Sequence, residues 1–362
     1  MIGSKEQQLV ALSPQQQRFS DITNNGFDGA YLTYIEIELI GQIDSQTLGS
    51  VLLETADTYD IFKLAFCQSE QQWHLQQQSR VACHFSEYNS SDTAAIEQLQ
   101  QQAKHRVFDV SLGPLVDIYI NANKSSCRLI IVMSGLCADQ TSIELFATSA
   151  LTNYHHVLTD NTADIKDLDV LQYPDITPWL NEAVSDPTGN SGRRFWRKVN
   201  YYASGKSVLK RELPGQPTSL FLPESVQLVF NDALNKRLSI LSKNETEQIC
   251  LAAWALVLQK YTQNPKLSLL TQVSGREYEE LSNVVGPLDK TLPLVFAYDE
   301  NQSVEDFIAS TKNVVLGSEE YKDYFFWPRL DDSNDNEAPF LNFMFQSCPI
   351  NGMTIGELFS VQ

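Results

Sequence analysis

Residues 129–154, LIIVMSGLCADQTSIELFATSALTNY, place several chemically capable side chains in one short turn. Ser134 and Cys137 carry a hydroxyl and a thiol that could act as nucleophiles, and Asp139 carries a carboxylate that could orient a base. Gly135 lies between them and offers no side chain. Because the turn follows an apolar run and precedes a helical pattern, it is the first candidate for an active site.

A serine or cysteine nucleophile needs a group that activates it, ordinarily a histidine. The five histidines of the chain are His74, His84, His105, His155 and His156. The pair at 155–156 lies at the far end of the helical pattern, and adjacent helical residues point about 100° apart, so only one could face a given site. No group near Cys137 in sequence would lower the pKa of its thiol. We therefore expect a structural pair of histidines, no serine hydrolase site at Ser134, and a Cys137 that packs under the turn.

The elements that must hold this turn are a buried strand and an amphipathic helix. Residues 127–134, CRLIIVMS, form the continuous apolar run of a central strand. The apolar residues of the following helix recur at helical spacing on one face, and they are Ile143, Phe146, Ala147, Ala150, Leu151 and Tyr154. Upstream, residues 31–41 predict a strand, and residues 45–57 predict a helix with an apolar face.

The second half of the chain repeats this alternation. Residues 181–193, NEAVSDPTGNSGR, collect turn-forming residues and predict a connection between two lobes. Asn244 and Glu247 resemble a capping box that opens a helix, and KLSLLTQV follows as a buried strand. The sequence therefore predicts an α/β protein with an N-terminal lobe over residues 1–180, a linker over 181–193, and a C-terminal lobe over 194–362.

Composition limits the class of partner. The formal net charge is -19 and the isoelectric point is near 4.6, so nucleic acids and anionic membranes would repel the chain. No apolar run reaches the roughly 18 to 20 residues of a membrane span, and no signal peptide pattern opens the chain, so we expect it in the cytoplasm. The six cysteines are scattered, without metal-ligand spacing, and are expected to be small buried residues.

Several motifs, read in order, resemble the condensation domain of nonribosomal peptide synthetases. The stretches that carry this resemblance are LSPQQQRF (12–19), TYDIFKLAF (58–66), FDVSLGPLVDIYI (108–120), YPDITPW (173–179), FWRKV (195–199), AAWALVLQKYTQNPKLSLLTQVSGRE (252–277) and VVGPLDKTLPLVF (284–296). The resemblance implies two lobes, each similar to chloramphenicol acetyltransferase, in a V-shaped pseudo-dimer around a cleft. The chain stops at MTIGELFSVQ, before such a domain is expected to end, so either the sequence is truncated or the last strands of the C-terminal lobe are absent.

The family motif H-H-x-x-x-D-G is replaced here by SGLCADQ. With its Asp aligned to Asp139, the two histidines become Ser134 and Gly135, and the glycine becomes Gln140. In the family, the second histidine lies where two carrier-bound substrates meet. An imidazole can exchange a proton near neutral pH or hold an attacking amine, and Gly135 can do neither. The resemblance therefore implies that ordinary peptide-bond formation is lost.

Other polar positions of the family motifs have changed as well. The arginine that pairs with the loop aspartate becomes Lys63, so we expect an Asp139–Lys63 ion pair that pins the loop and gives Asp139 a structural role. The asparagine and arginine of N-T-L-P-L-R become Lys290 and Val295. Arg276 is expected to bridge the lobes or lie on the surface.

The resemblance implies a role for a member that keeps the fold and drops the chemistry. Such members serve as docking platforms that bring a trans-acting tailoring enzyme to an intermediate held on a peptidyl carrier protein, beside neighbouring synthetase domains. The only prosthetic group expected is the phosphopantetheine arm of that carrier; no cofactor or metal of the chain's own is expected. Because carriers are usually acidic, the overall charge does not favour tight carrier binding, whereas a basic patch on a partner would suit it.

Two alternatives remain open. The first is an acyltransferase that still acts on carrier-bound thioesters through a reassigned loop containing Ser134 and Asp139. The second is a degenerate linker domain that only spaces its neighbours. Turnover of loaded carriers would favour the enzyme, and a complex with a tailoring enzyme would favour the platform.

Overall fold

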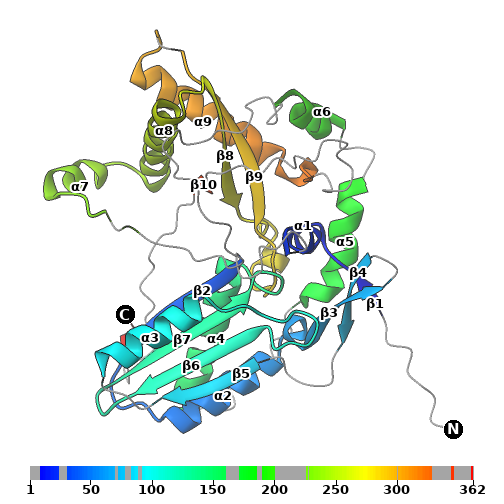
Figure 1. The fold of residues 1–362 in the computed structure, drawn as a ribbon, viewed down its shortest axis with the longest axis vertical. Helices are drawn as coiled ribbons and strands as arrows, with labels where there is room; N and C mark the ends of the chain where they lie inside the picture. Colours follow the sequence, from blue (N-terminus) through cyan, green and yellow to red (C-terminus); the bar gives the residue numbers. More distant parts are fainter. Residues whose placement is uncertain are drawn as a thin grey trace, which may run out of the picture.

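The computed structural model describes most of the chain. The described residues are 9–23, 31–69, 72–77, 83–88, 92–159, 171–185, 190–199, 226, 228–299, 301–327, 344–345 and 360–361. Figure 1 shows a larger sheet with its helices in the N-terminal half and a smaller sheet with its helices in the C-terminal half. The fold is mixed α/β, as the sequence predicts.

The larger sheet has five strands in the order β11-β2-β7-β6-β5. Its strands are β2 (Leu32–Ile40), β5 (Cys83–Tyr88), β6 (Val116–Ala122), β7 (Ser126–Ser134) and β11 (Ser360–Val361). The central strand β7 pairs antiparallel with β2 on one side and with β6 on the other, whereas β5 runs parallel to β6. The strands predicted at 31–41 and 127–134 are thereby confirmed.

Both faces of this sheet are covered by helices. Along β7, Leu129, Ile131 and Met133 join the core that includes α2 (Ser45–Asp57) and α4 (Gln140–Leu158). The alternate residues Ile130 and Val132 join a second cluster with α3 (Thr93–Lys104). This double burial explains why β7 is apolar at successive positions.

The helices over this sheet bury the faces that the sequence predicts. The buried residues of α2 include Leu48, Val51, Leu52 and Thr55. The buried residues of α4 include Ile143, Phe146, Ala147, Ala150, Leu151 and Tyr154. The periodicity of these two segments therefore identified both the helices and their inward faces.

A smaller sheet lies beside the first, in the order β1-β4-β3. Its strands are β1 (Leu9–Ala11), β3 (Leu64–Ser69) and β4 (Gln72–Gln77), and β4 pairs antiparallel with both neighbours. Near it lie α1 (Pro14–Thr23), the short helix η1 (Asp60–Lys63) and α5 (Tyr173–Ser185).

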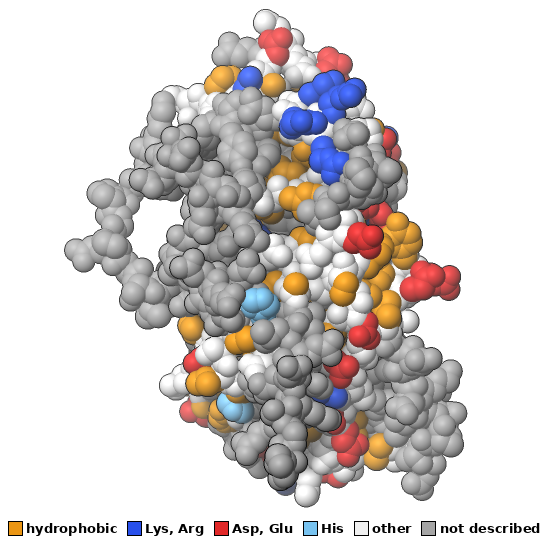
Figure 2. All heavy atoms as spheres, turned by 90° about the vertical axis from the view of Figure 1, so that its right-hand side faces the viewer, with side chains coloured by type: hydrophobic (Ala, Val, Ile, Leu, Met, Phe, Trp, Pro, Cys, Tyr) orange, Lys and Arg blue, Asp and Glu red, His pale blue; other side chains and the backbone are white. Residues whose placement is uncertain are grey.

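The C-terminal half contains a sheet in the order β10-β8-β9. It consists of β8 (Lys266–Val273), β9 (Lys290–Ala297) and β10 (Met344–Phe345), packed with α8 (Lys243–Thr262) and α9 (Val304–Glu320). The remaining elements are α6 (Asn190–Val199), α7 (Asp232–Leu238), η4 (Glu279–Leu281) and η5 (Lys322–Tyr324). Figure 2 shows basic side chains gathered near the upper end of one face, with acidic side chains both above and below them.

Two sequence predictions about local structure need correction. Helix α8 begins two residues earlier than expected: Ser242, not Asn244, is its N-cap and forms the capping box with Glu245, so the predicted box of Asn244 and Glu247 is wrong. The predicted linker 181–193 is largely helical, because α5 extends to Ser185 and α6 begins at Asn190. The two-lobe boundaries and the V shape stay predictions.

The two halves share a core. The main cluster of buried residues in the N-terminal half also contains Leu281, Val284, Val285 and Leu288. These four residues lie between β8 and β9 in the chain, more than a hundred residues after the end of α4. The segment 281–288 therefore completes the core of the N-terminal half from the C-terminal half.

Candidate functional site

The turn between β7 and α4 has the strand, turn and helix layout that the sequence predicts. Ser134 ends β7, and its amide N–H donates to Leu115 O at 2.9 Å. The amide N–H of Cys137 and that of Ala138 both donate to Ser134 O, which closes a tight turn. Asp139 has extended backbone and caps α4, because its side chain accepts from Ser142 N at 2.8 Å.

Gly135 is buried, and neighbouring atoms fill the space where a side chain would begin. Its N–H donates to Tyr31 O at 2.9 Å. A Cβ atom placed on Gly135 would lie 2.9 Å from Phe19 Cε1 and 3.0 Å from Tyr31 O. Real Cβ contacts are rarely this short, so an added side chain would have to displace Phe19 or the backbone. The position that carries the second histidine in the family motif is therefore closed by Phe19.

Phe19 is held where it blocks this position. It projects from α1, and its ring packs edge-on against the ring of Tyr31 with centroids 4.7 Å apart. The ring also packs against the main core cluster. Aromatic pairs in this geometry are favourable beyond their burial.

Ser134 and Cys137, the two nucleophile types in the turn, are both occupied structurally. Ser134 is 6% exposed, and its hydroxyl oxygen accepts from Leu136 N at 3.3 Å. Cys137 is fully buried, and its thiol lies 3.2 Å from Ser134 O and 3.6 Å from Leu115 O. Burial raises the pKa of the Cys137 thiol well above its usual range. Cys137 packs under the turn, as the sequence predicts.

Asp139 forms a buried bidentate ion pair with Arg276. Arg276 Nη1 donates to Asp139 Oδ2 at 2.7 Å, and Nη2 donates to Oδ1 at 2.9 Å. Both side chains are only 4% exposed. Arg276 follows β8, so this pair joins the turn of the N-terminal half to the C-terminal half. Two parallel charge-assisted hydrogen bonds fix orientation as well as distance.

The same carboxylate accepts further hydrogen bonds from the segment that enters the N-terminal core. Asp139 Oδ2 accepts from Leu288 N at 2.8 Å and from Asp289 N at 2.9 Å. The hydroxyl of Ser142 lies 2.6 Å from Asp139 Oδ1 and accepts from Gly286 N at 2.9 Å. These bonds make Asp139 a point of contact between the turn and the segment that follows β8.

The partner predicted for Asp139 is wrong. Lys63 Nζ lies 3.3 Å from Asp60 Oδ1 and 3.9 Å from Asp57 Oδ1, at the end of η1. The predicted Asp139–Lys63 ion pair is not formed because Arg276 takes the carboxylate. Arg276 is thus the lobe-bridging residue, one of the two roles expected of it, and its identity as Asp139's partner was missed.

Asp289 is a second carboxylate facing the same guanidinium. Its Oδ1 lies 3.4 Å from Arg276 Nη1, and its Oδ2 accepts from Gln272 Nε2 at 3.2 Å. Burial, followed by the negative charge of Asp139, raises the pKa of Asp289 to about 7, and Arg276 opposes this shift. The sequence offered no signal for this pairing, because Asp289 lies in an apolar motif.

The histidine pair lies far from this turn. His155 and His156 are in the last turn of α4, whose first turn is capped by Asp139. With a rise of 1.5 Å per residue, the pair lies roughly 24 Å along the helix from Asp139. It supplies no base to Ser134 or Cys137.

The two substituted polar positions on β9 have structural contacts. Lys290 Nζ forms an ion pair with Asp323. Val295 packs against an aromatic cluster that includes Trp196 and Phe325. Both residues therefore make contacts within the C-terminal half.

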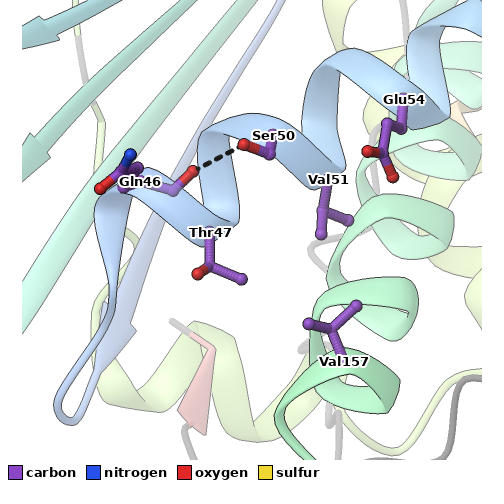
Figure 3. Close-up of a pocket in the computed structure, with 6 residues that line it drawn as sticks. All are labelled: Gln46, Thr47, Ser50, Val51, Glu54 and Val157. Carbon is purple, nitrogen blue, oxygen red and sulfur yellow. Dashed lines mark hydrogen bonds between the residues drawn. The ribbon is translucent and has the colours of Figure 1, made fainter.

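A cavity of about 320 Å³ lies away from the turn, between α2 and the end of α4. Figure 3 shows the residues that line it, which are Gln46, Thr47, Ser50, Val51, Glu54 and Val157. Val157 is roughly 27 Å along α4 from Asp139. With a single carboxylate and no base beside it in this lining, the cavity offers no catalytic constellation.

Two further kinds of feature bear on function in the described part of the chain, metal-ligand clusters and membrane-spanning helices. No group of three His, Cys, Asp or Glu side chains there could hold a metal ion, and no helix there is long and apolar enough to cross a membrane. Cys127 and Cys137 are buried, Cys67, Cys83 and Cys250 are half-buried, and Cys348 lies outside the described residues.

Comparison with known sequences identifies the class of domain that this chain resembles. The sequence profile of the condensation domain matches residues 6–350. The chain is 24% identical over 354 residues to Gramicidin S synthase 2 of Brevibacillus brevis, covering 91% of this chain. It is 22% identical over 370 residues to Tyrocidine synthase 2 of Brevibacillus parabrevis, covering 98% of this chain. It spans only 8% and 10% of the length of these relatives.

Solved structures share the fold at low sequence identity. The first condensation domain of the CDA synthetase aligns with a TM-score of 0.78 and 13% identity, covering 98% of this chain and 84% of that one. The X-domain from teicoplanin biosynthesis aligns with a TM-score of 0.69 and 18% identity, covering 89% and 73%. That X-domain is also solved in a complex with OxyB, at a TM-score of 0.65 and 17% identity, covering 89% and 72%.

Proposed function

Because this chain belongs to the condensation domain family of nonribosomal peptide synthetases, we propose that it is a catalytically inactive member. In this proposal the chain is a docking platform that recruits a trans-acting tailoring enzyme to an intermediate bound on a carrier protein. The observation that carries the proposal is the closure of position 135, where Gly135 lacks a side chain and Phe19 fills the adjacent space.

The missing imidazole sets the expected loss of rate. A positioned general base or orienting group contributes about 10²- to 10⁴-fold to catalysis. Neither Ser134 nor Asp139 compensates, because the Ser134 hydroxyl is bound to the turn and both Asp139 oxygens are bound to Arg276. Asp139 also lies too deep in the junction between the halves to reach two meeting substrates.

Retention of the fold supports a role for the surface. The junction around Asp139 and the core around β7 remain fully built, although the polar positions of the family motif have changed. The X-domain of teicoplanin biosynthesis, a similar fold, is solved in a complex with OxyB. A complex of this kind is what a platform would form with its own tailoring enzyme.

The competing proposal is an acyltransferase that works through Ser134 and Asp139. It requires that both side chains leave the contacts described above. It predicts turnover of carrier-bound thioesters that Ser134→Ala or Asp139→Asn abolishes.

The experiment that separates these proposals measures turnover and binding with the same protein. Two carrier domains loaded with acyl thioesters are incubated with the purified chain, and joined products are detected by mass spectrometry. We expect no product above the blank without the chain. We also expect a saturable complex between the chain and an oxygenase or hydroxylase encoded beside it, with unchanged affinity in Ser134→Ala.

Either of two results would overturn the platform. Product formation that depends on the chain and on Ser134 would establish the acyltransferase. Neither product nor complex, with every neighbouring tailoring enzyme tested, would leave only a spacer role.

A further inference from the structure

Helix α6 carries a basic face on a strongly acidic protein. Within residues 190–199 it has four basic side chains and no acidic one, and they are Arg193, Arg194, Arg197 and Lys198. We call these four residues the basic face. Their spacing of i, i+1, i+4 and i+5 places them side by side along one side of the helix.

The basic face points away from the protein. Arg194, Arg197 and Lys198 are exposed and Arg193 is half-buried. Among the described residues, no carboxylate pairs with Arg194 or Lys198. Figure 2, which views the side that carries α6, shows the basic side chains gathered near the upper end of the molecule.

The opposite face fixes α6 in place. Trp196 is 6% exposed, and its Nε1 donates to Tyr321 O at 2.7 Å. Its ring lies 4.6 Å from that of Phe325, and the Phe195 ring lies 4.9 Å from that of Tyr321. Because α6 is anchored by this aromatic packing, its charges are presented on a rigid element, and binding costs little ordering of the backbone.

The local charge contrasts with the charge of the whole chain. Seven of the 26 lysines and arginines fall within residues 187–211, which contain no acidic residue, in a chain with a net charge of -19. At physiological ionic strength the Debye length is about 8 Å, so a partner in contact with α6 senses the basic face far more than the carboxylates that lie beyond this distance. The overall charge therefore does not exclude an acidic partner at this site.

We infer that the basic face of α6 docks a protein helix whose exposed side carries three or four carboxylates. The basic face consists of two i, i+4 pairs, Arg193 with Arg197 and Arg194 with Lys198. Carboxylates spaced i, i+4 and i+7 on the partner helix would match these two pairs. Arginine can bind a carboxylate through two parallel hydrogen bonds. Acidic helices are the surface expected of carrier proteins, so the inference deepens the proposed function and rests on it for the source of the helix.

A nucleic acid is the less suitable occupant. A nucleic acid strand carries many more phosphates than the four positive charges of the basic face. The phosphates beyond the basic face would be repelled by the rest of a chain with a net charge of -19. A short acidic helix covers only the basic face.

The test measures binding of a fluorescein-labelled helical peptide of about 20 residues. The peptide has glutamates at i, i+4, i+7 and i+11 and alanines elsewhere, and binding is followed by fluorescence anisotropy at about 0.15 M salt. We expect the variant Arg194→Glu/Arg197→Glu/Lys198→Glu to bind at least 10-fold more weakly than the unmodified chain. Circular dichroism melting confirms that the variant remains folded.

The matched control reverses the same number of charges elsewhere. Lys236, Arg237 and Lys260 are exposed on α7 and α8, and their replacement by Glu should change peptide affinity by less than about 2-fold. Equal losses in both variants, or no saturable binding to the unmodified chain, would refute the site. Displacement of the peptide by an equal length of single-stranded DNA would assign the face to nucleic acid instead.

The result is separable from the proposed function. If the peptide fails to bind while a tailoring enzyme still forms a complex, only the acidic-helix site is refuted. If the peptide binds and no tailoring enzyme does, the platform proposal fails and the basic face stands.

Discussion

At the scale of single residues, the ring of Phe19 and the absence of a side chain at Gly135 complement each other. An aromatic ring from α1 occupies the space that a side chain at position 135 would need. The loss of the imidazole is therefore accompanied by repacking, and a single reverse substitution cannot restore the family's geometry. The ring and the glycine should be energetically coupled, because each accommodates the other.

This coupling predicts a non-additive mutational cycle. Gly135→Ala should lower the free energy of unfolding by about 1–3 kcal/mol, because the new methyl group is forced against Phe19 and the Tyr31 carbonyl. In a Phe19→Ala background the same change should cost much less. Urea unfolding of the four proteins measures the coupling, and additive costs would show that Phe19 does not close the position.

The residues of this site were only partly predictable. The departure from the family's histidine was visible in the sequence because one motif contains it. The partner of Asp139 was not, because Lys63 and Arg276 both offer a positive charge and only the fold decides which one reaches the carboxylate. Arg276 lies 137 positions away in sequence. Periodicity says nothing about contacts over that distance.

At the scale of elements, the buried helices and strands followed from sequence patterns. The apolar run of β7 and the inward faces of α2 and α4 were predicted because burial imposes periods of two and 3.6 residues. The ends of the helices were predicted less accurately than their buried faces. At α8, two overlapping Ser/Asn and Glu pairs fit a capping box, and the structure uses Ser242 with Glu245. In the linker, turn-forming residues lie within the ends of α5 and α6.

The capping box of α8 gives an element-scale prediction. Ser242 Oγ accepts from Glu245 N, and Glu245 Oε2 accepts from Ser242 N. Ser242→Ala should therefore destabilise the chain by about 1 kcal/mol, because a helical N–H loses its acceptor. Asn244→Ala should cost nothing, since residue 244 lies inside the helix and alanine is the better helix former. Thermal unfolding compares them, and a larger loss in Asn244→Ala would restore the box predicted from sequence.

At the scale of the whole molecule, the two halves are joined by charge and by apolar packing. The carboxylates of Asp139 and Asp289 face the guanidinium of Arg276, and the charge of Glu144 adds to the negative surroundings of Asp289. The segment 281–288 enters the N-terminal core beside this cluster. A change of charge in the cluster should therefore affect the stability of the whole chain.

Asp289 gives this junction a pH dependence. Its carboxyl keeps a proton up to about pH 7 in the folded chain, whereas an unfolded Asp loses it near pH 4. The folded state binds more protons in that window, so this group makes the free energy of unfolding fall as the pH rises from about 4 to 7. One proton contributes at most about 1.4 kcal/mol per pH unit.

Asp289→Asn should remove this contribution. We expect the variant to match the unmodified chain near pH 4 and to exceed it in stability at pH 8, because the amide cannot ionise beside Asp139. Asp175→Asn, at an exposed position on α5, is the control and should leave the pH dependence unchanged. Urea midpoints measured across this range decide the matter, and parallel curves for Asp289→Asn and the unmodified chain would contradict it.

The insertion of residues 281–288 into the N-terminal core also determines when this core can be completed during synthesis on the ribosome. At synthesis rates of 5–20 residues per second, the hundred or so residues between position 180 and this segment take roughly 5 to 20 s to appear. Throughout that interval the nascent N-terminal half lacks Leu281, Val284, Val285 and Leu288, and its apolar sites for them stay open. Chaperone binding during translation should accordingly be strongest in this interval and end once the segment emerges.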